Sequence, residues 1–286
     1  MDLSEIKKER IITMFTVEQY NAIGKELEEL LSLRFLPIAV KKLFSKDEIP
    51  EGCYQPSKER GEHPALCQAF AQVRRNKRSI AMFREDHWCL WPIIAFKDGE
   101  MTEADVEYVG TKWFIKDPQM SLEYFKNNYP YVKEDCLPGL ALAPLSSCTF
   151  VPDAVVIYCF PAQLRQLLMA SKYHTAKIAD ASLDTTGSCI FSIVPVLNGE
   201  KDYNVSIPDP GEYERALSDE NEMIFTVAGD KVGELVESIT RIKTMGFGYK
   251  ELALDMNIDY PRAEFYNKMF EKWGLETGAQ WKIGER

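Results

Sequence analysis

The chain contains seven cysteines, an odd number that cannot all pair with one another. Its first eight residues include no apolar stretch typical of an export signal, which predicts a cytoplasmic protein with reduced thiols. Both observations argue against a disulfide scaffold and leave the thiols available for packing, catalysis or metal binding. At 286 residues, the chain is long enough for one large domain or two small ones. The cysteines are Cys53, Cys67, Cys89, Cys136, Cys148, Cys159 and Cys189.

The net charge of the chain limits the kinds of partner that we expect it to bind. Aspartate and glutamate number 44 against 34 lysines and arginines, which gives a net charge of −10. Such a charge disfavours non-specific binding to nucleic acid or to an anionic membrane. A membrane span needs about 18 or more uninterrupted apolar residues, and none is present. The most apolar segment, residues 137–145, is broken by Pro138, Gly139 and Pro144.

Local patterns in the first half predict both helices and strands. Thr16 followed by Gln19 is a capping-box pattern, and the apolar spacing after it predicts a helix over 16–32. Proline suits the first helical position, so we expect a second helix to begin at His63-Pro64. The other expected elements are strands at 35–44, 79–83 and 89–96, a loop at 45–62, and a helix from Thr102 that ends at Gly110.

The second half continues this irregular alternation. Residues 111–150 are expected to be irregular apart from a helix near 119–128, and 198–212 to be a loop. Strands are expected at 154–159, 188–196 and 222–227, and helices at 161–173, 229–245 and 262–273. Because there is no regular βαβ rhythm, we predict a single mixed α+β domain over 1–250. It would have a weak subdivision near 145–152 and a C-terminal helical tail over 251–286.

Several cysteines and histidines are spaced in ways that suit chemistry, although no serine-hydrolase, Walker, dinucleotide or Cys-x-x-Cys pattern is present. His63 and Cys67 are four residues apart at a helix start, so both can lie on one face. A thiolate is favoured in a first helical turn. Cys89 and Cys189 enter expected strands from loops, where ligands often lie. The plain alternative for each is packing, because free cysteine is among the most buried residue types.

Three arginines are candidate contacts for a carboxylate or phosphate. Arg74 and Arg75 lie in a basic run at the end of the second expected helix, and Arg215 follows the turn-like sequence Pro208-Asp209-Pro210-Gly211. Such a turn can form an anion-binding nest. The alternatives are a solvated helix end, which cations favour, and an ordinary turn.

Short motifs lie in order at 37–41, Cys67 with Ala71, Cys89, Gly110, 144–145, 152–156, 161–163, 170–173, Gly187-Ser188-Cys189, Gly211 with Arg215 and Ala216, and 222–223. In this order and spacing they resemble the domain-of-unknown-function 169 family, also called uncharacterised ArCR proteins. The family is one of prokaryotes, many of them anaerobes, and the resemblance brings an architecture rather than a reaction. Its pattern carries cysteines at the positions of Cys67, Cys89 and Cys189.

Three thiolates from separate segments suggest a shared metal centre. They can hold a [4Fe–4S] cluster while one iron stays open to a substrate, and the leading hypothesis is such a protein in anaerobic metabolism with a small anionic substrate. The competing metal is zinc, with His63 or His87 as a fourth ligand. One alternative is a non-catalytic ligand-binding or accessory/regulatory module. The other is a cysteine-nucleophile enzyme with Cys67 activated by His63 or His87. The candidate partners are a small molecule, a larger enzyme to which the chain is an accessory subunit, and a second copy of the chain in a homo-oligomer.

Overall fold

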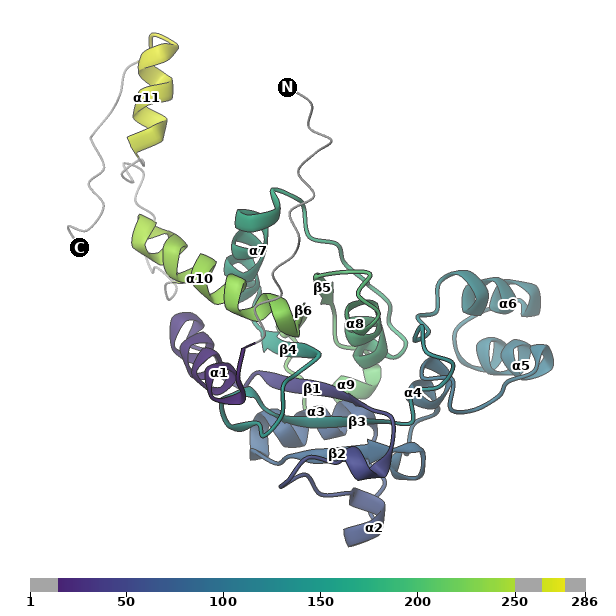
Figure 1. Ribbon diagram of the computed structural model, residues 1–286. Helices are drawn as coiled ribbons and strands as arrows, with labels where there is room; N and C mark the ends of the chain where they lie inside the picture. The colour runs from purple at the N-terminus through teal and green to yellow at the C-terminus, as the bar shows by residue number, and fades with distance from the viewer. Residues whose placement is uncertain (1–14, 250–263, 276–286) are drawn as a thin grey trace, which may run out of the picture.

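A twisted antiparallel sheet forms the centre of the molecule (Figure 1). The computed structural model describes residues 15–249 and 264–275, and within these ranges the sheet has six strands in the order β2-β3-β1-β4-β6-β5. Together with the helices around it, the sheet confirms the mixed α+β class. The strands are β1 (Ile38–Leu43), β2 (Ile80–Phe83), β3 (Gly139–Pro144), β4 (Ala154–Cys159), β5 (Tyr203–Ser206) and β6 (Met223–Ala228).

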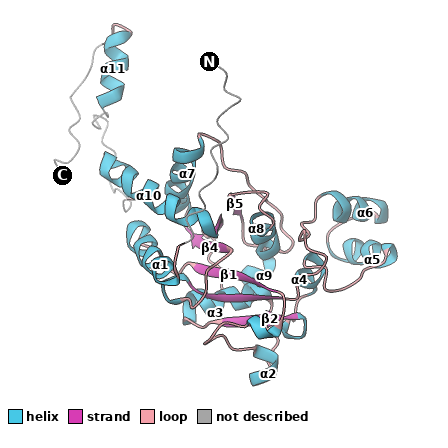
Figure 2. Cartoon of the chain, viewed as in Figure 1, coloured by secondary structure: helices cyan, strands magenta, loops and turns pink. Residues whose placement is uncertain are grey.

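Helices cover both faces of this sheet (Figure 2). Side chains alternate along a strand, so Val156 and Tyr158 of β4 enter one core layer, whereas Val155 and Ile157 enter the other. We call the layer that contains Tyr158 the first layer; α3, α4 and α8 pack there. The second layer contains Ile157 and is covered by α1, α7 and α10.

The helices vary in length and in how far they agree with the sequence patterns. The α-helices in the described residues are α1 (Val17–Leu31), α2 (Pro56–Arg60), α3 (Leu66–Asn76), α4 (Leu90–Ala95), α5 (Glu103–Trp113), α6 (Pro118–Asn127), α7 (Pro161–Thr175), α8 (Ser188–Leu197), α9 (Pro210–Arg215), α10 (Val232–Ile242) and α11 (Glu264–Lys272). The capping box at Thr16 and Gln19 is confirmed, since each side chain bonds the other residue's backbone N–H. The predictions for β1, β2, β4, β6, α6, α7 and α10 are confirmed to within a few residues.

Two segments that the sequence predicted as strands are helices. Residues 89–96 contain α4, and residues 188–196 form most of α8. Every residue of α8 is buried, so its apolar run has no polar side to reveal a helical period. Pro195 inside α8 has no N–H for the carbonyl of Phe191, and Asn204 of β5 donates to that carbonyl instead, at 2.8 Å.

Other predicted boundaries were wrong for local reasons. Helix α3 begins at Leu66 rather than at His63-Pro64. Helix α5 continues through Gly110, whose missing side chain lets α6 approach: an added Cβ would lie 1.9 Å from the hydroxyl of Ser121. The segments predicted as irregular or loop contain α2, β3, β5 and α9, and in β3 the proline and glycine positions fall at the strand ends.

The described residues include only part of the chain to which the remaining predictions on domain organisation apply. Strands β3 and β4, on either side of residues 145–152, belong to one sheet. Helix α11 agrees with the helix predicted near 262–273, whereas the rest of the tail from residue 251 lies outside the described residues, except for 273–275. Among the described helices, none combines the length and apolar character that crossing a membrane requires.

Candidate thiol site

Three cysteines occupy the starts of three helices on the first layer. Cys67 is the second residue of α3, Cys89 precedes the first residue of α4, and Cys189 is the second residue of α8. Cys89 packs against a small cluster that contains Cys67 and also against the large core cluster that contains Cys189. The structure thus brings together three residues that are 22 and 100 positions apart in the sequence.

Burial keeps these thiols protonated when no cation is bound. Burial is the main cause that raises the pKa of Cys67, Cys89 and Cys189. The pKa of Cys189 is raised further by the charges of Cys67, Asp209, Glu212 and Cys89. The charge of Cys89 also raises the pKa of Cys67, so the three thiols lie within electrostatic reach of one another. A bound cation would reverse this balance in favour of the thiolates.

Asp209 connects two of the helix starts at this site. Its Oδ2 accepts hydrogen bonds from the backbone N–H groups of Gly187 and Ser188, both at 2.8 Å, and its Oδ1 accepts from the N–H of Glu212 at 2.9 Å. One carboxylate therefore caps α9 and holds the first residues of α8. Gly187 has a φ of 81°, a left-handed conformation that glycine adopts without strain. Asp209 consequently sets the position of Cys189.

Arg215 lies beside the thiols with its guanidinium over the ring of Trp88, 4.7 Å from the ring centroid. Its charge lowers the pKa of both Cys67 and Cys89. The guanidinium folds back over the start of its own helix, where a Cβ on Gly211 would lie 2.4 Å from Nη2. Its Nε is buried and has no hydrogen-bond partner among the described residues. Of the three predicted anion contacts, Arg215 is the one placed next to the cysteines.

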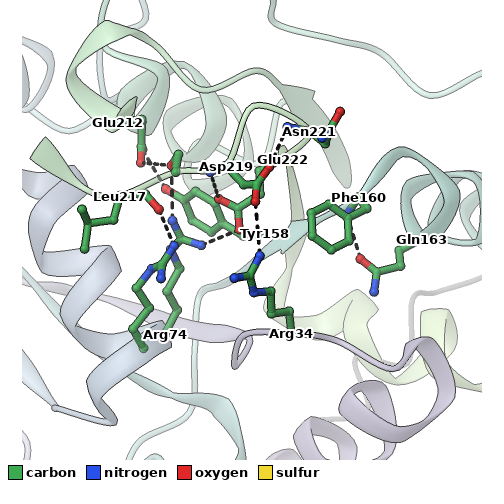
Figure 3. Close-up of polar contacts among 12 residues, drawn as sticks. Arg34, Arg74, Tyr158, Phe160, Gln163, Glu212, Leu217, Asp219, Asn221 and Glu222 are labelled. Atoms are coloured by element: carbon green, nitrogen blue, oxygen red, sulfur yellow. Dashed lines mark hydrogen bonds and ion pairs between the residues drawn. The ribbon is translucent and has the colours of Figure 1, made fainter. Parts of the chain in front are cut away.

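Arg74 has a different environment, an entirely internal one (Figure 3). Its guanidinium pairs with Glu222 at 2.8 Å, donates to the hydroxyl of Ser218 at 3.2 Å and lies 3.9 Å from the ring centroid of Tyr158. Both partners of the ion pair are buried, with side chains 0% and 2% exposed. An external anion would have to displace Glu222 to reach Arg74, so the proposed anion contact there stays a prediction.

Glu212 is a second buried carboxyl in this network. It accepts from the hydroxyl of Tyr158 at 2.7 Å and from Ser218 at 3.1 Å (Figure 3). Burial raises the pKa of Glu212 to about 7, against the hydrogen bond from Tyr158, which lowers it. Arg74 contributes only a smaller lowering because it pairs with Glu222. Glu212 therefore titrates near neutral pH, within electrostatic reach of Cys67 and Cys189.

The remaining candidates make contacts elsewhere. Arg75 donates to the carbonyl of Leu217, and its guanidinium lies 4.1 Å from the ring centroid of Phe35. His63 contacts the carbonyl of Glu85 through Nδ1 at 2.8 Å. Burial lowers the pKa of His87 to about 4, and the charges that act on it are those of Asp86 and Glu85. Neither histidine is thereby placed as a general base for Cys67.

The other four cysteines provide a contrast. Cys53, Cys148 and Cys159 belong to the second layer, on the opposite face of the sheet, and Cys136 contacts Asp98 at 3.6 Å. All seven thiols are free. Within residues 15–249 and 264–275, no three His, Cys, Asp or Glu side chains are arranged to hold a single metal ion.

Sequence reasoning did not identify Asp209 and Glu212 as site residues. The signal was present, because Asp209 followed by Pro210 and, three residues on, by Glu212 is a helix-start pattern. The pairing of Arg74 with Glu222 had no local signal, since 148 positions separate the two residues.

Comparisons with known proteins agree with the family named from the motifs. The family model described as Uncharacterised ArCR matches residues 26–238. An uncharacterised protein of Methanocaldococcus jannaschii is 23% identical over 231 residues, which cover 79% of this chain and 96% of that protein. No solved structure matches. Because the family model covers more than half of the sequence, the chain belongs to the uncharacterised ArCR family.

Proposed function

We propose that this member of the uncharacterised ArCR family is an iron–sulfur protein, in which Cys67, Cys89 and Cys189 ligate a [4Fe–4S] cluster. The observation that carries the proposal is the meeting of three thiols from α3, α4 and α8 at one place. Three cysteine ligands leave one iron of such a cluster open. When bound, the cluster would supply an electron port or a Lewis-acidic iron.

The charges around the thiols support an anionic cluster. A cluster held by three thiolates carries net negative charge, and the helix starts at Cys67 and Cys189 present positive dipole ends to it. Arg215 adds a full positive charge whose effect reaches Cys67 and Cys89.

The chain's own residues then have separable tasks. Arg215 holds a small carboxylate or phosphate beside the open position, with Trp88 covering one side of its guanidinium. Asp209 fixes the start of α8 and with it Cys189. The pair of Arg74 and Glu222 keeps α3 against the segment that follows α9. We assign this protein to anaerobic metabolism, where such a cluster is protected from oxygen.

Anaerobic purification followed by iron, zinc and sulfide analysis tests the proposal. We expect about four iron and four sulfide per chain, a brown colour, and loss of both on exposure to air. One zinc per chain with no iron would favour the alternative in which His63 or His87 completes the site. Protein that cannot be loaded with either metal, with seven free thiols, would contradict both.

A set of serine variants separates ligands from packing residues. Cys67→Ser, Cys89→Ser and Cys189→Ser should each lower the iron content of anaerobically reconstituted protein several-fold. Cys136→Ser is the matched control, because Cys136 contacts Asp98 away from the three thiols and should leave the iron content unchanged. Equal iron content in all four variants would remove these residues as ligands.

A further inference from the structure

A pocket lies between α6, α8 and the loop that follows α7. Its volume is about 620 Å³, which is within the range of sites for drug-sized ligands. Its lining combines aromatic rings with one lysine, and the residues used below are Tyr124, Tyr131, Ser182, Asp184, Phe191 and Lys201. None of these residues belongs to the proposed thiol site, so the inference does not depend on that proposal.

One wall of the pocket is a set of fixed aromatic rings. The ring of Tyr129 is 5.3 Å from that of Tyr131 and 5.8 Å from that of Phe191, both in edge-to-face geometry. The hydroxyl of Tyr129 donates to the carbonyl of Trp91 at 2.9 Å, and this bond fixes the orientation of the Tyr129 ring. Ordered rings of this kind offer a flat ligand an apolar surface at little cost in entropy.

Lys201 brings a positive charge to the pocket and is not paired with a carboxylate among the described residues. Its ammonium contacts only neutral oxygens, Ser182 Oγ and Asn204 Oδ1, both at 3.3 Å. Among the described residues it makes no ion pair, and the neighbouring Glu200 is instead 3.8 Å from Lys133. A half-buried ammonium with neutral partners retains its capacity to bind an anion.

The two carboxylates that line the pocket, those of Asp184 and Glu200, are already engaged, and Glu200 accepts from the side-chain amide of Asn198 at 3.0 Å besides its contact with Lys133. Asp184 accepts from the hydroxyl of Tyr124 at 2.9 Å and from the N–H of Thr186 at 2.7 Å. The bond from Tyr124 ties the loop after α7 to α6 at one side of the pocket, and the bond from Thr186 holds Asp184 within that loop. Asp184 is thus part of the frame, and Lys201 is the charge that remains for a ligand.

We propose that this pocket binds a small molecule with one flat ring and one anionic group, a carboxylate or a phosphate. The ring packs against Tyr131 and Phe191, and the anionic group pairs with Lys201. None of the three cysteines lines the pocket, and Tyr129, which does, lies within electrostatic reach of Cys189 and Cys89. The pocket is consequently a binding site distinct from the thiol site.

Ligand-observed NMR titrations test this with four probes. 4-Aminobenzoate and adenosine monophosphate carry a flat ring with a carboxylate or a phosphate, and cyclohexanecarboxylate and inorganic phosphate lack the flat ring. We expect at least one ring-bearing anion to bind the full chain, with its ring-free counterpart about tenfold weaker or more. Which of the two binds identifies the anionic group.

Two variants locate the binding. Lys201→Met keeps the side-chain stem and should weaken the bound probe by about tenfold or more, as expected for a charge-assisted hydrogen bond. Tyr131→Ala should weaken it through loss of the ring contact. Lys58→Met, on the exposed face of α2, is the control and should change nothing. Melting temperatures establish that each variant is folded.

Three results would overturn the proposal. Neither ring-bearing anion binding at millimolar concentration would refute it. So would an affinity that is the same in wild type, Lys201→Met and Tyr131→Ala, or inorganic phosphate and cyclohexanecarboxylate binding as tightly as the ring-bearing probes.

Discussion

The two faces of the sheet use the same residue types for different purposes. The second layer packs Cys53, Cys148 and Cys159 among the apolar side chains of α1, α7 and α10. The first layer places Cys67 and Cys189 near the buried charges of Asp209 and Glu212. Burying charge is costly and needs specific partners. Both layers bury large apolar clusters, and the first layer in addition carries the cost of a buried charged network beside its thiols.

The largest expected effect comes from breaking the buried ion pair of the first layer. Arg74→Met would leave Glu222 buried without its cation, and should lower the free energy of unfolding by about 3–5 kcal/mol. Urea denaturation measures this. The matched control is Arg34→Met, which breaks the more exposed pair with Asp219 and should cost less than about 1 kcal/mol. Equal losses in the two variants would contradict a specialised first layer.

The pH dependence of stability should carry the signature of Glu212. Its pKa is raised from 4.5 to about 7 in the folded protein, so the folded state binds the proton more tightly than the unfolded state. The contribution of Glu212 to stability is therefore present below pH 4.5 and is lost as the pH rises to about 7, by about 3 kcal/mol at most.

Glu212→Gln tests that contribution, because glutamine does not titrate. Unfolding free energies of wild type and variant, measured between pH 4.5 and 8, should diverge in favour of the variant as the pH rises. A difference between the two proteins that stays constant over this range would show that Glu212 does not titrate as described.

Asp209 should contribute less, because its bonds are to backbone groups. Asp209→Ala removes the cap of α9 and the two bonds to the start of α8, and should cost about 2 kcal/mol. Asp117→Ala, which removes a simple cap from α6, should cost about 1 kcal/mol. Thermal or urea unfolding compares them. If Asp209→Ala costs no more than Asp117→Ala, Asp209 does not hold α8.

The smallest effect concerns the position of Arg215. In Gly211→Ala the new Cβ displaces the guanidinium, whose end is flexible, so stability should change by less than about 1 kcal/mol. In the wild type the guanidinium lowers the pKa of Cys89. Moving it away should raise that pKa, so alkylation of Cys89 in the metal-free Gly211→Ala variant should be slower than in the wild type. Arg215→Gln should slow it similarly. Unchanged alkylation in both variants would mean that Arg215 does not act on the thiols.

The sequence predicted much of the second layer and less of the first. Helices α1, α7 and α10 have one apolar side each, so their spacing is readable, and Thr16 marks the first start. Helix α8 is buried on every side, and its apolar run looks the same as a buried strand. The strand expected at Cys189 was wrong for this reason, and the strand expected at Cys89 was wrong because α4 has only six residues, too few to show a helical period. Both residues were nevertheless selected as ligands through the family resemblance.

The polar part of the first layer depends on contacts between distant segments. Arg74 looks like an ordinary basic helix end until Glu222, far along the chain, is placed beside it. Arg215 next to Cys67 likewise follows only once α9 is placed against α3. Local pattern therefore identified residue types, and tertiary packing decided which of them share a site.

The most direct test of the account replaces the cysteines one face at a time. Anaerobically reconstituted Cys67→Ala/Cys89→Ala/Cys189→Ala protein should contain almost no iron or sulfide. Cys53→Ala/Cys148→Ala/Cys159→Ala protein, folded by circular dichroism, should retain about four of each per chain. Iron retained by the first variant, or lost equally by both, would contradict the claim that the first layer holds the cluster.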